Sequence, residues 1–323
     1  MRSPIVLVLL LLGKLALAQE MVSGTNNPSP VKPVVSNPVP SEANSLAQNT
    51  RVIPFIRAGN LIVIKGIADT TEGNFILDTG APGLILNLTY FRQYKQADTE
   101  GRGSVAGAVV GAVQTLVDKF SFGGLEFNRL DADMINLGHI EDKRNIKILG
   151  LIGVSFFKDT EMIIDYEKMV IHLHRISKKE ATTYKSPMLD SGKYTMLNFD
   201  VLDNKIIAKV KLGERKMKFF IDTGAESNVL DSRLPNKVYE NVTITGRSKV
   251  VGAGNKTIEG LFGNLKNLKV GDRDMGSLPF VITNLENACI SEVCCIDGIL
   301  GFNFLSVQKI GFNFIKGEMY LWK

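Results

Sequence analysis

Two short stretches of the chain could carry the same chemistry. "FILDTGAPGL" contains Asp78 and "FFIDTGAESN" contains Asp222, and each places Asp-Thr-Gly-Ala after a hydrophobic run. The two aspartates are 222 − 78 = 144 residues apart in a chain of 323 residues. A given tetrapeptide turns up by chance in a chain of this length well under ~1 time in 100. The repetition therefore indicates two carboxylates with a common role.

Paired carboxylates can act on an amide bond, whereas a single carboxylate in a turn does little. Two carboxylates about 3 Å apart share one proton, because like charges at that distance do not both stay ionised. The ionised group then takes a proton from a bound water, and its protonated neighbour hydrogen-bonds the substrate carbonyl. Asp78 and Asp222 are therefore the candidate general base and general acid.

The residues that follow each aspartate suit the support of such a pair. The hydroxyls of Thr79 and Thr223 can bond across to the opposite loop and hold the two halves in register. Gly80 and Gly224 allow backbone amides to approach the carboxylates closely. We expect these four residues to shape the two active-site loops.

The elements around the two sites repeat as well. "LIVIKGIADTTEGNFILDTGA", which starts at Leu61, matches "KIIAKVKLGERKMKFFIDTGA", which starts at Lys205. Each copy predicts a strand, a polar turn and a second strand that ends at the aspartate. Downstream, a hydrophobic pair plus glycine recurs as Leu151-Ile152-Gly153 and Ile299-Leu300-Gly301, which we expect to pack behind the loops. A short helix and a terminal hairpin follow in both copies.

The remaining pattern predicts an all-β protein. Strands of four to eight residues, rich in Val, Ile, Phe and Thr, are bounded by Gly, Asn and Asp, and long helical periodicity is absent. One such stretch, "KFSFGGLEFNRL" at 119–130, predicts a hairpin that turns at its glycines. We expect two similar lobes, residues 51–176 and 192–323, joined by a polar linker at 177–191.

These duplicated motifs resemble those of aspartic peptidases of the pepsin and retropepsin superfamily, over roughly residues 52–322. The resemblance implies a bilobal aspartic-protease fold, with two retropepsin-like β-barrel lobes and the active site between them. It implies an endopeptidase that cleaves a peptide or protein substrate in an extended conformation, with Asp78 and Asp222 as the catalytic dyad. No cofactor or metal is expected. A catalytically inactive peptide-binding protein with the same fold is the alternative.

Two features depart from the pepsin pattern. Ala81 and Ala225 follow the glycines where pepsins carry Ser or Thr, so each carboxylate loses a hydrogen bond to its charged form. The dyad should therefore have higher pKa values than in pepsin and a mildly acidic to near-neutral optimum. The stretches at 100–116 and 246–262 are rich in glycine and lack the flap tyrosine of pepsins. They suggest two flexible flaps, one per lobe, as in a retropepsin dimer.

The N-terminal 50 residues predict export. Residues 1–18 read as a signal peptide, with basic Arg2, an apolar run too short to span a bilayer, and a small-x-small cleavage site. Residues 19–50 hold five prolines among Ser, Asn and Val, which predicts a disordered tether. The mature chain should be soluble and lie in the periplasm or outside the cell.

Charge and cysteine content limit the partners. The formal net charge of +5 falls to +3 without Arg2 and Lys14, which suggests neither a nucleic-acid nor a membrane-surface partner. Both carboxylates come from one chain, so we expect a monomer. The cysteines at 289, 294 and 295 predict one disulfide from Cys289 to Cys294 or Cys295, with one thiol left over.

Overall fold

The computed structural model covers most of the chain after Thr50. The described residues are 12–13, 50–95, 113–186, 189, 193–251, 257–286 and 295–323. Most of the predicted signal peptide and tether, the turn of each predicted flap, and Cys289 and Cys294 lie outside these residues. Cys295 is described and is disulfide-bonded.

The N-terminal lobe is a closed six-stranded barrel. Its strands are β4 (Leu61–Ala68), β5 (Thr71–Leu77), β6 (Leu84–Asn87), β7 (Val113–Phe122), β8 (Leu125–Ile135) and β9 (Gly150–Ile152). The order is β4-β5-β9-β6-β8-β7, and β7 pairs again with β4. The predicted hairpin at 119–130 is confirmed as β7–β8, which turns at Gly123 and Gly124 with positive φ angles of 56° and 78°. A short strand, β3 (Ile56–Ala58), extends the sheet beside β4.

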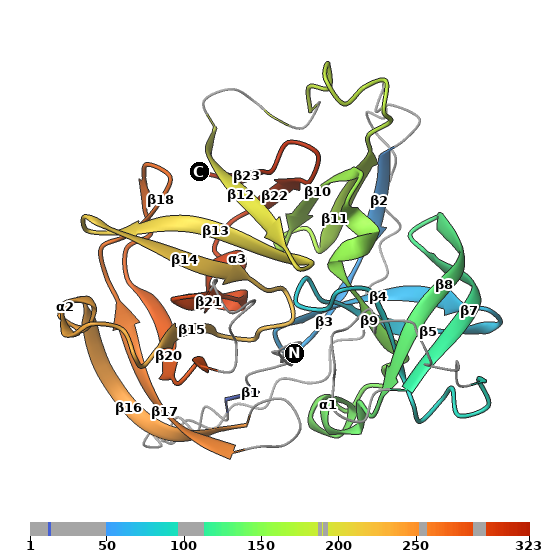
Figure 1. The fold of residues 1–323 in the computed structure, drawn as a ribbon, viewed down its shortest axis with the longest axis horizontal. Coiled ribbons are helices and arrows are strands. Elements are labelled where there is room, and N and C mark those ends of the chain that lie inside the picture. The colour runs from blue at the N-terminus through green and yellow to red at the C-terminus, as the bar shows by residue number, and fades with distance from the viewer. Residues whose placement is uncertain are drawn as a thin grey trace, which may run out of the picture.

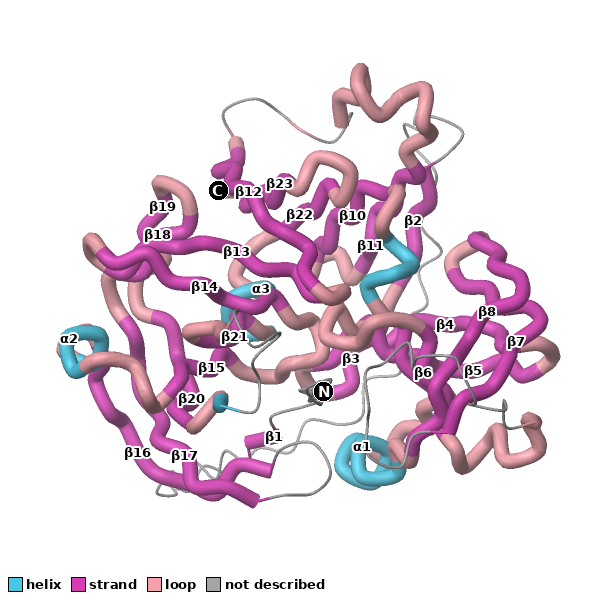
Figure 2. The backbone as a smooth tube through the Cα atoms, in the orientation of Figure 1, coloured by secondary structure: helices cyan, strands magenta, loops and turns pink. Residues whose placement is uncertain are grey.

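The C-terminal lobe repeats this order. Its strands are β13 (Lys205–Leu212), β14 (Arg215–Ile221), β15 (Asn228–Asp231), β16 (Val242–Val251), β17 (Thr257–Leu265), β18 (Leu268–Val270), β19 (Arg273–Asp274), β20 (Leu278–Thr283) and β21 (Gly298–Leu300). The order is β13-β14-β21-β15-β20-β17-β16, and β18 pairs with β13. A two-residue strand, β1 (Leu12–Gly13), pairs with the edge of β16. Figures 1 and 2 show the two strand-rich lobes side by side.

A six-stranded sheet joins the two halves. It contains β2 (Thr50–Pro54), β10 (Thr160–Asp165), β11 (Val170–Arg175), β12 (Tyr194–Leu202), β22 (Ile310–Asn313) and β23 (Glu318–Trp322). The order β12-β23-β22-β10-β11-β2 takes three strands from each half. Ile163 pairs with Gly311, and Met162 and Ile164 pair with Phe312 and Ile310 on either side. The two halves are therefore related by an approximate twofold axis through this central pair.

Helices are few and short among the described residues. They are α1 (Gly138–Arg144), α2 (Asn236–Tyr239), α3 (Phe302–Leu305) and the 3-10 helix η1 (Val154–Phe157). η1 and α3 directly follow β9 and β21, where the sequence predicts a short helix in each copy. The predominance of strands, the closed barrel and its repetition confirm the predicted all-β, bilobal fold.

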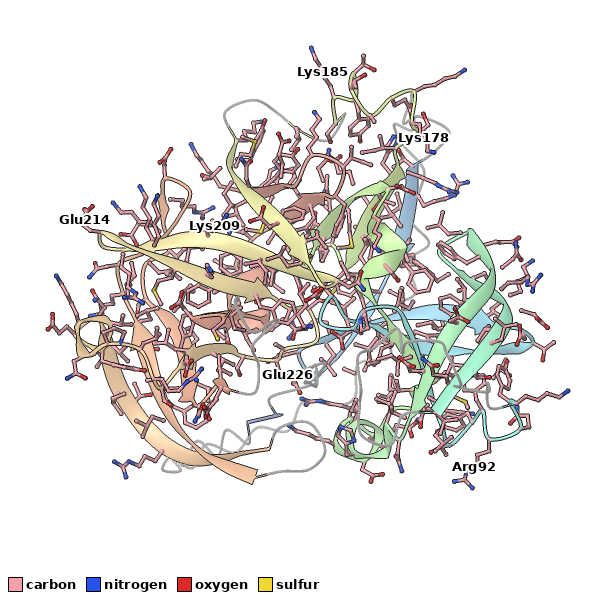
Figure 3. All side chains as sticks on the ribbon, in the orientation of Figure 1. Arg92, Lys178, Lys185, Lys209, Glu214 and Glu226 are labelled. Carbon is pink, nitrogen blue, oxygen red and sulfur yellow. The ribbon has the colours of Figure 1, made fainter. Side chains whose placement is uncertain are left out.

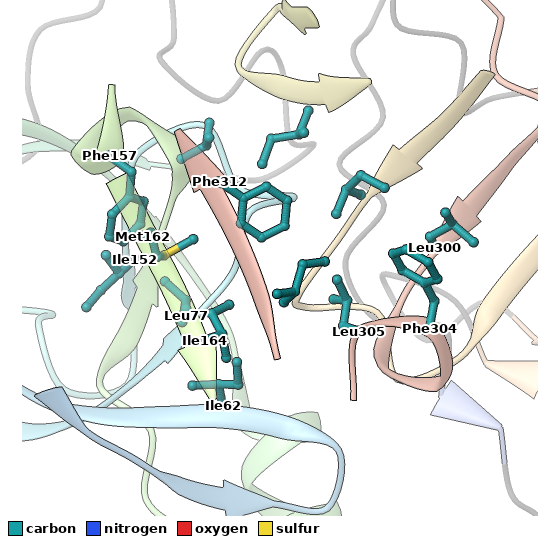
Figure 4. Close-up of a cluster of buried hydrophobic side chains, with 14 of the residues drawn as sticks. Ile62, Leu77, Ile152, Phe157, Met162, Ile164, Leu300, Phe304, Leu305 and Phe312 are labelled. Atoms are coloured by element: carbon teal, nitrogen blue, oxygen red, sulfur yellow. The ribbon is translucent and has the colours of Figure 1, made fainter. Parts of the chain in front are cut away.

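One apolar core runs through both lobes and the sheet between them. It includes Leu77 and Ile152 from the N-terminal barrel, Ile164 and Phe312 from the joining sheet, and Leu300 from the C-terminal barrel. Figure 4 shows these side chains in one cluster around β10 and β22. Because the core is continuous, the burial of apolar surface stabilises the arrangement of the lobes as well as each lobe.

The outer face of the joining sheet is partly covered by the segment that follows β11. Tyr184, which lies in the predicted linker, is buried, and its ring stacks on His174 with centroids 4.8 Å apart. Its hydroxyl donates a hydrogen bond of 3.0 Å to buried Glu161, and Lys316 donates to the Tyr184 carbonyl oxygen. The linker is therefore anchored to the sheet at this position.

Candidate active site

The two Asp-Thr-Gly loops meet between the lobes. Asp78 directly follows β5 and Asp222 directly follows β14, and both side chains are buried. The amide of Asp78 donates to the carbonyl of Ile152, and that of Asp222 donates to the carbonyl of Leu300, each at 3.0 Å. The hydrophobic pairs of the two repeats thus hold the loops from behind, as their parallel pairing with β5 and β14 requires.

The glycines explain why the two carboxylates can come together. A Cβ atom on Gly80 would lie 2.8 Å from Oδ1 of Asp222 and 2.9 Å from Oδ1 of Asp78. A Cβ atom on Gly224 would lie 2.5 Å from Oδ1 of Asp78. Each glycine therefore leaves room for the carboxylate of the opposite lobe, and both carboxylates converge on the same small region.

Two threonines tie the loops to each other by four hydrogen bonds. The hydroxyl of Thr79 donates to the carbonyl of Ile221 at 3.0 Å and accepts from the Thr223 amide at 3.0 Å. The hydroxyl of Thr223 donates to the carbonyl of Leu77 at 2.8 Å and accepts from the Thr79 amide at 2.9 Å. Every one of these bonds crosses between the lobes. They fix the position of the aspartate that precedes each threonine.

The loop glycines donate hydrogen bonds to one oxygen of each carboxylate. The amide of Gly80 donates to Oδ1 of Asp78, and the amide of Gly224 donates to Oδ1 of Asp222, each at 2.8 Å. Oδ2 of Asp222 is buried and has no hydrogen-bond partner among the described residues. A buried oxygen of this kind is satisfied by a proton, a water or a substrate group.

Burial raises the pKa of both aspartates. It raises the pKa of Asp78 to about 6, although the hydrogen bond from the Gly80 amide opposes the rise. Burial also raises the pKa of Asp222, and the negative charge of Asp78 raises it further. The pair therefore favours one shared proton, and it does so up to higher pH than two exposed aspartates would.

The site also contains an ion pair that the sequence did not reveal. Arg144, at the end of α1, bonds Glu226, which lies four residues after Asp222 in the opposite lobe. Asn60, in the β3–β4 turn, donates to the Glu226 carbonyl at 3.2 Å. Figure 3 shows Glu226 on the side of its lobe that faces α1. The first repeat has Pro82 at the corresponding position, so this contact exists on one side of the site alone.

All six predicted site residues therefore lie in one place, on two loops that touch. Little is described of the predicted flaps: residues 96–112 and 252–256 fall outside the described part of the chain. Strands β16 and β17 form the described portion of the second flap as an antiparallel hairpin. The signal for Glu226 was present in the sequence as the difference between "DTGAP" and "DTGAE", but its partner is 82 residues away.

Comparison with known proteins agrees with this geometry. A search of curated proteins finds no match to the chain. The model of the family described as aspartyl protease matches residues 63–156 and 208–304, which together are more than half of the chain. Each matched region holds one Asp-Thr-Gly loop and the strands around it. The chain belongs to the aspartyl protease family.

Proposed function

We propose that the protein is an exported aspartic endopeptidase in which Asp78 and Asp222 act as one catalytic dyad. The observation that carries the proposal is the convergence of two buried carboxylates on loops that the Thr79 and Thr223 hydroxyls tie together. Membership of the aspartyl protease family supports a peptidase function. The steps of the proposed reaction depend on the proton that the two aspartates share.

In this mechanism the two aspartates have different tasks. Ionised Asp78 takes a proton from a water held between the carboxyls, and the water oxygen attacks the peptide carbonyl carbon. Protonated Asp222 donates its proton to the carbonyl oxygen as the tetrahedral intermediate forms. The leaving nitrogen then takes up a proton from Asp78, the C–N bond breaks, and a hydroxyl of the intermediate returns a proton to Asp222. The raised pKa of Asp222 suits the acid, because the group keeps its proton to higher pH than an exposed aspartate does.

The substrate is a peptide segment in an extended conformation that lies between the lobes. An extended chain presents backbone donors and acceptors on both edges, which suits a site enclosed by strands. The protein works as a monomer, because a single chain supplies both loops and the hydrogen bonds between them.

Export rests on the N-terminal sequence. Residues 1–18 have the basic start, apolar run and small-residue end of a signal peptide. Across the described residues, the structure contains no helix that is both long and apolar enough to cross a bilayer. We place the mature protein in the periplasm or outside the cell, with residues 19–50 as a tether before the first lobe.

The test is cleavage of an unfolded protein by the mature chain across pH 3 to 8. Asp78→Asn and Asp222→Asn should each reduce kcat at least about a thousandfold, because residues that act as a unit fail together. Asp272→Asn, in an exposed turn, is the matched control and should cleave like the parent. Circular dichroism and thermal melting establish that each variant folds.

Either outcome is informative. Loss of cutting in both dyad variants, with cutting retained in the Asp272→Asn control, supports the peptidase. A folded parent that binds extended peptides but shows no cutting dependent on these carboxylates contradicts it. That result would leave the catalytically inactive peptide-binding protein.

A further inference from the structure

The two aspartates face different residues across their hairpins. In β4–β5 the register pairs Val63 with Ile76, and its continuation sets Leu61 opposite Asp78. In β13–β14 the register pairs Ile206 with Ile221, and its continuation sets Lys205 opposite Asp222. Leu61 and Lys205 are each the first residue of their strand. The approximate twofold symmetry of the site is therefore broken by one cation beside Asp222.

Lys205 is buried in surroundings that suit leucine. Its side chain lies on the same face of β13 as Ile207, which packs in the apolar cluster around Ala225. Leu61 occupies the corresponding cluster with Ala81 and is completely buried, and Lys205 is only 7 % exposed. The lysine thus replaces an apolar side chain on the strand opposite Asp222, whose charge acts on its ammonium group.

The ammonium group has no partner in the described part of the chain. Lys205 takes part in none of the ion pairs or side-chain hydrogen bonds found there, and the anions that act on it from nearby are Asp203 and Asp222. Burial lowers the pKa of Lys205, and the two aspartates only partly oppose this. Most of the Lys205 side chain is buried, but its Nζ atom is not among the buried polar atoms that lack a hydrogen-bond partner, so solvent reaches the ammonium group.

A carboxylate is the group that would complete this site. It pairs with an ammonium group at short range and restores the stability of the charged form. Asp222 shares the proton of the pair with Asp78 and is therefore a weak partner for the ammonium group. The solvent-accessible ammonium group is thus open to an anion from outside the chain, and the molecule that enters beside Asp222 is the substrate.

We propose that Lys205 determines specificity by binding the carboxylate of an acidic side chain of the peptide substrate, on the side of the cleft that Asp222 forms. The side that Asp78 forms, where Leu61 stands in its place, accepts an apolar side chain. The cleavage sites then carry Asp or Glu at one fixed position relative to the scissile bond. This inference rests on the proposed peptidase function.

The first experiment maps cleavage sites in a mixture of peptides by mass spectrometry of the new termini. The parent should enrich Asp and Glu at one position. Lys205→Met, which keeps the length of the side chain and removes its charge, should lose this enrichment. Lys209→Met is the matched control: Lys209 lies farther along the same strand, where it is exposed and pairs with Asp200, and its variant should keep the enrichment (Figure 3).

Two synthetic peptides, identical except for Glu or Gln at the enriched position, give the magnitude. The parent should cleave the Glu peptide with a kcat/KM roughly ten- to a hundredfold higher than the Gln peptide. Lys205→Met should cleave both about equally. The preference should vanish below about pH 4, where the Glu side chain is protonated. A role limited to the proton on Asp222 would instead shift the pH profile of both peptides alike, and that result overturns the proposal.

A measurement of peptide binding tests the role of Lys205 separately from the proposed peptidase activity. Fluorescence anisotropy with the Asp78→Asn variant measures the affinity of both peptides without turnover. Tighter binding of the Glu peptide, lost when Lys205→Met is added, supports the inference even if the parent does not cleave. Equal affinities, or an unchanged acid preference in Lys205→Met, overturn it and leave the peptidase proposal untouched if the parent cleaves.

Discussion

At the scale of single residues, burial determines how the dyad responds to pH. Both carboxyls have raised pKa values because they are enclosed, and the Gly80 and Gly224 amides offset only part of that effect. The alanines after each glycine provide no hydroxyl that could lower the pKa values further. The shared proton therefore persists to higher pH than two exposed aspartates would allow.

The pH profile of kcat/KM should follow from these shifts. The proposed mechanism requires one ionised and one protonated carboxyl, so activity should fall when the pair gains a second proton and when it loses its only one. Raised pKa values move both limbs upward, and we expect a maximum at mildly acidic to near-neutral pH. Measurement from pH 2 to 9 with an uncharged peptide tests this. A maximum near pH 2 would show that the carboxyls titrate like exposed ones.

At the scale of elements, the sequence predicted the strands, turns and hairpins that occur in both repeats. The matched strands, turns and glycines around Asp78 and Asp222 determine each barrel, and they correctly indicated the two-lobed all-β fold. Each terminal hairpin was also recognised, as β10–β11 and β22–β23. The pairing of β10 with β22 was not predicted, because the two strands are distant in sequence and nothing in either sequence indicates the other as its partner.

The threonine bonds couple the two loops, and their removal should affect both lobes. Thr223→Val would leave the Leu77 carbonyl and the Thr79 amide unpaired in a buried site. We expect a loss of about 1–3 kcal/mol in the free energy of unfolding, measured by urea denaturation, together with lower kcat. Thr223→Ser keeps the hydroxyl and should recover most of both.

The control for this prediction is Thr182→Val, at an exposed threonine in the segment after β11. Its free energy of unfolding should stay within about 0.5 kcal/mol of the parent. A Thr223→Val variant as stable as this control would mean that water satisfies the exposed backbone groups and that the loops do not depend on the hydroxyl.

At the scale of the whole molecule, the lobes are joined by more than the sheet. The common core and the threonine bonds are nearly symmetric, whereas the Arg144–Glu226 pair and Lys205 each occur on one side alone. A symmetric site would bind a peptide equally in either direction. These charges give the cleft two distinguishable sides. The alignment of the two repeats already sets Lys205 against Leu61 and Glu226 against Pro82, but it could not predict that Glu226 meets Arg144 of the other lobe.

The Arg144–Glu226 pair should therefore contribute to the coupling of the lobes. Both side chains are largely buried, 17 % and 8 % exposed, so removal of one partner leaves a buried charge. We expect Arg144→Met or Glu226→Gln to cost about 3 kcal/mol in the free energy of unfolding, and the double variant to cost less than the sum. The exposed Lys119–Glu126 pair, within one lobe, is the control and should show a coupling below about 1 kcal/mol.

Unfolding should remain one cooperative transition in every variant, because the continuous core still joins the lobes. Additive effects at 144 and 226 would show instead that the two charges are solvated separately and that the core and the threonines alone fix the arrangement of the lobes.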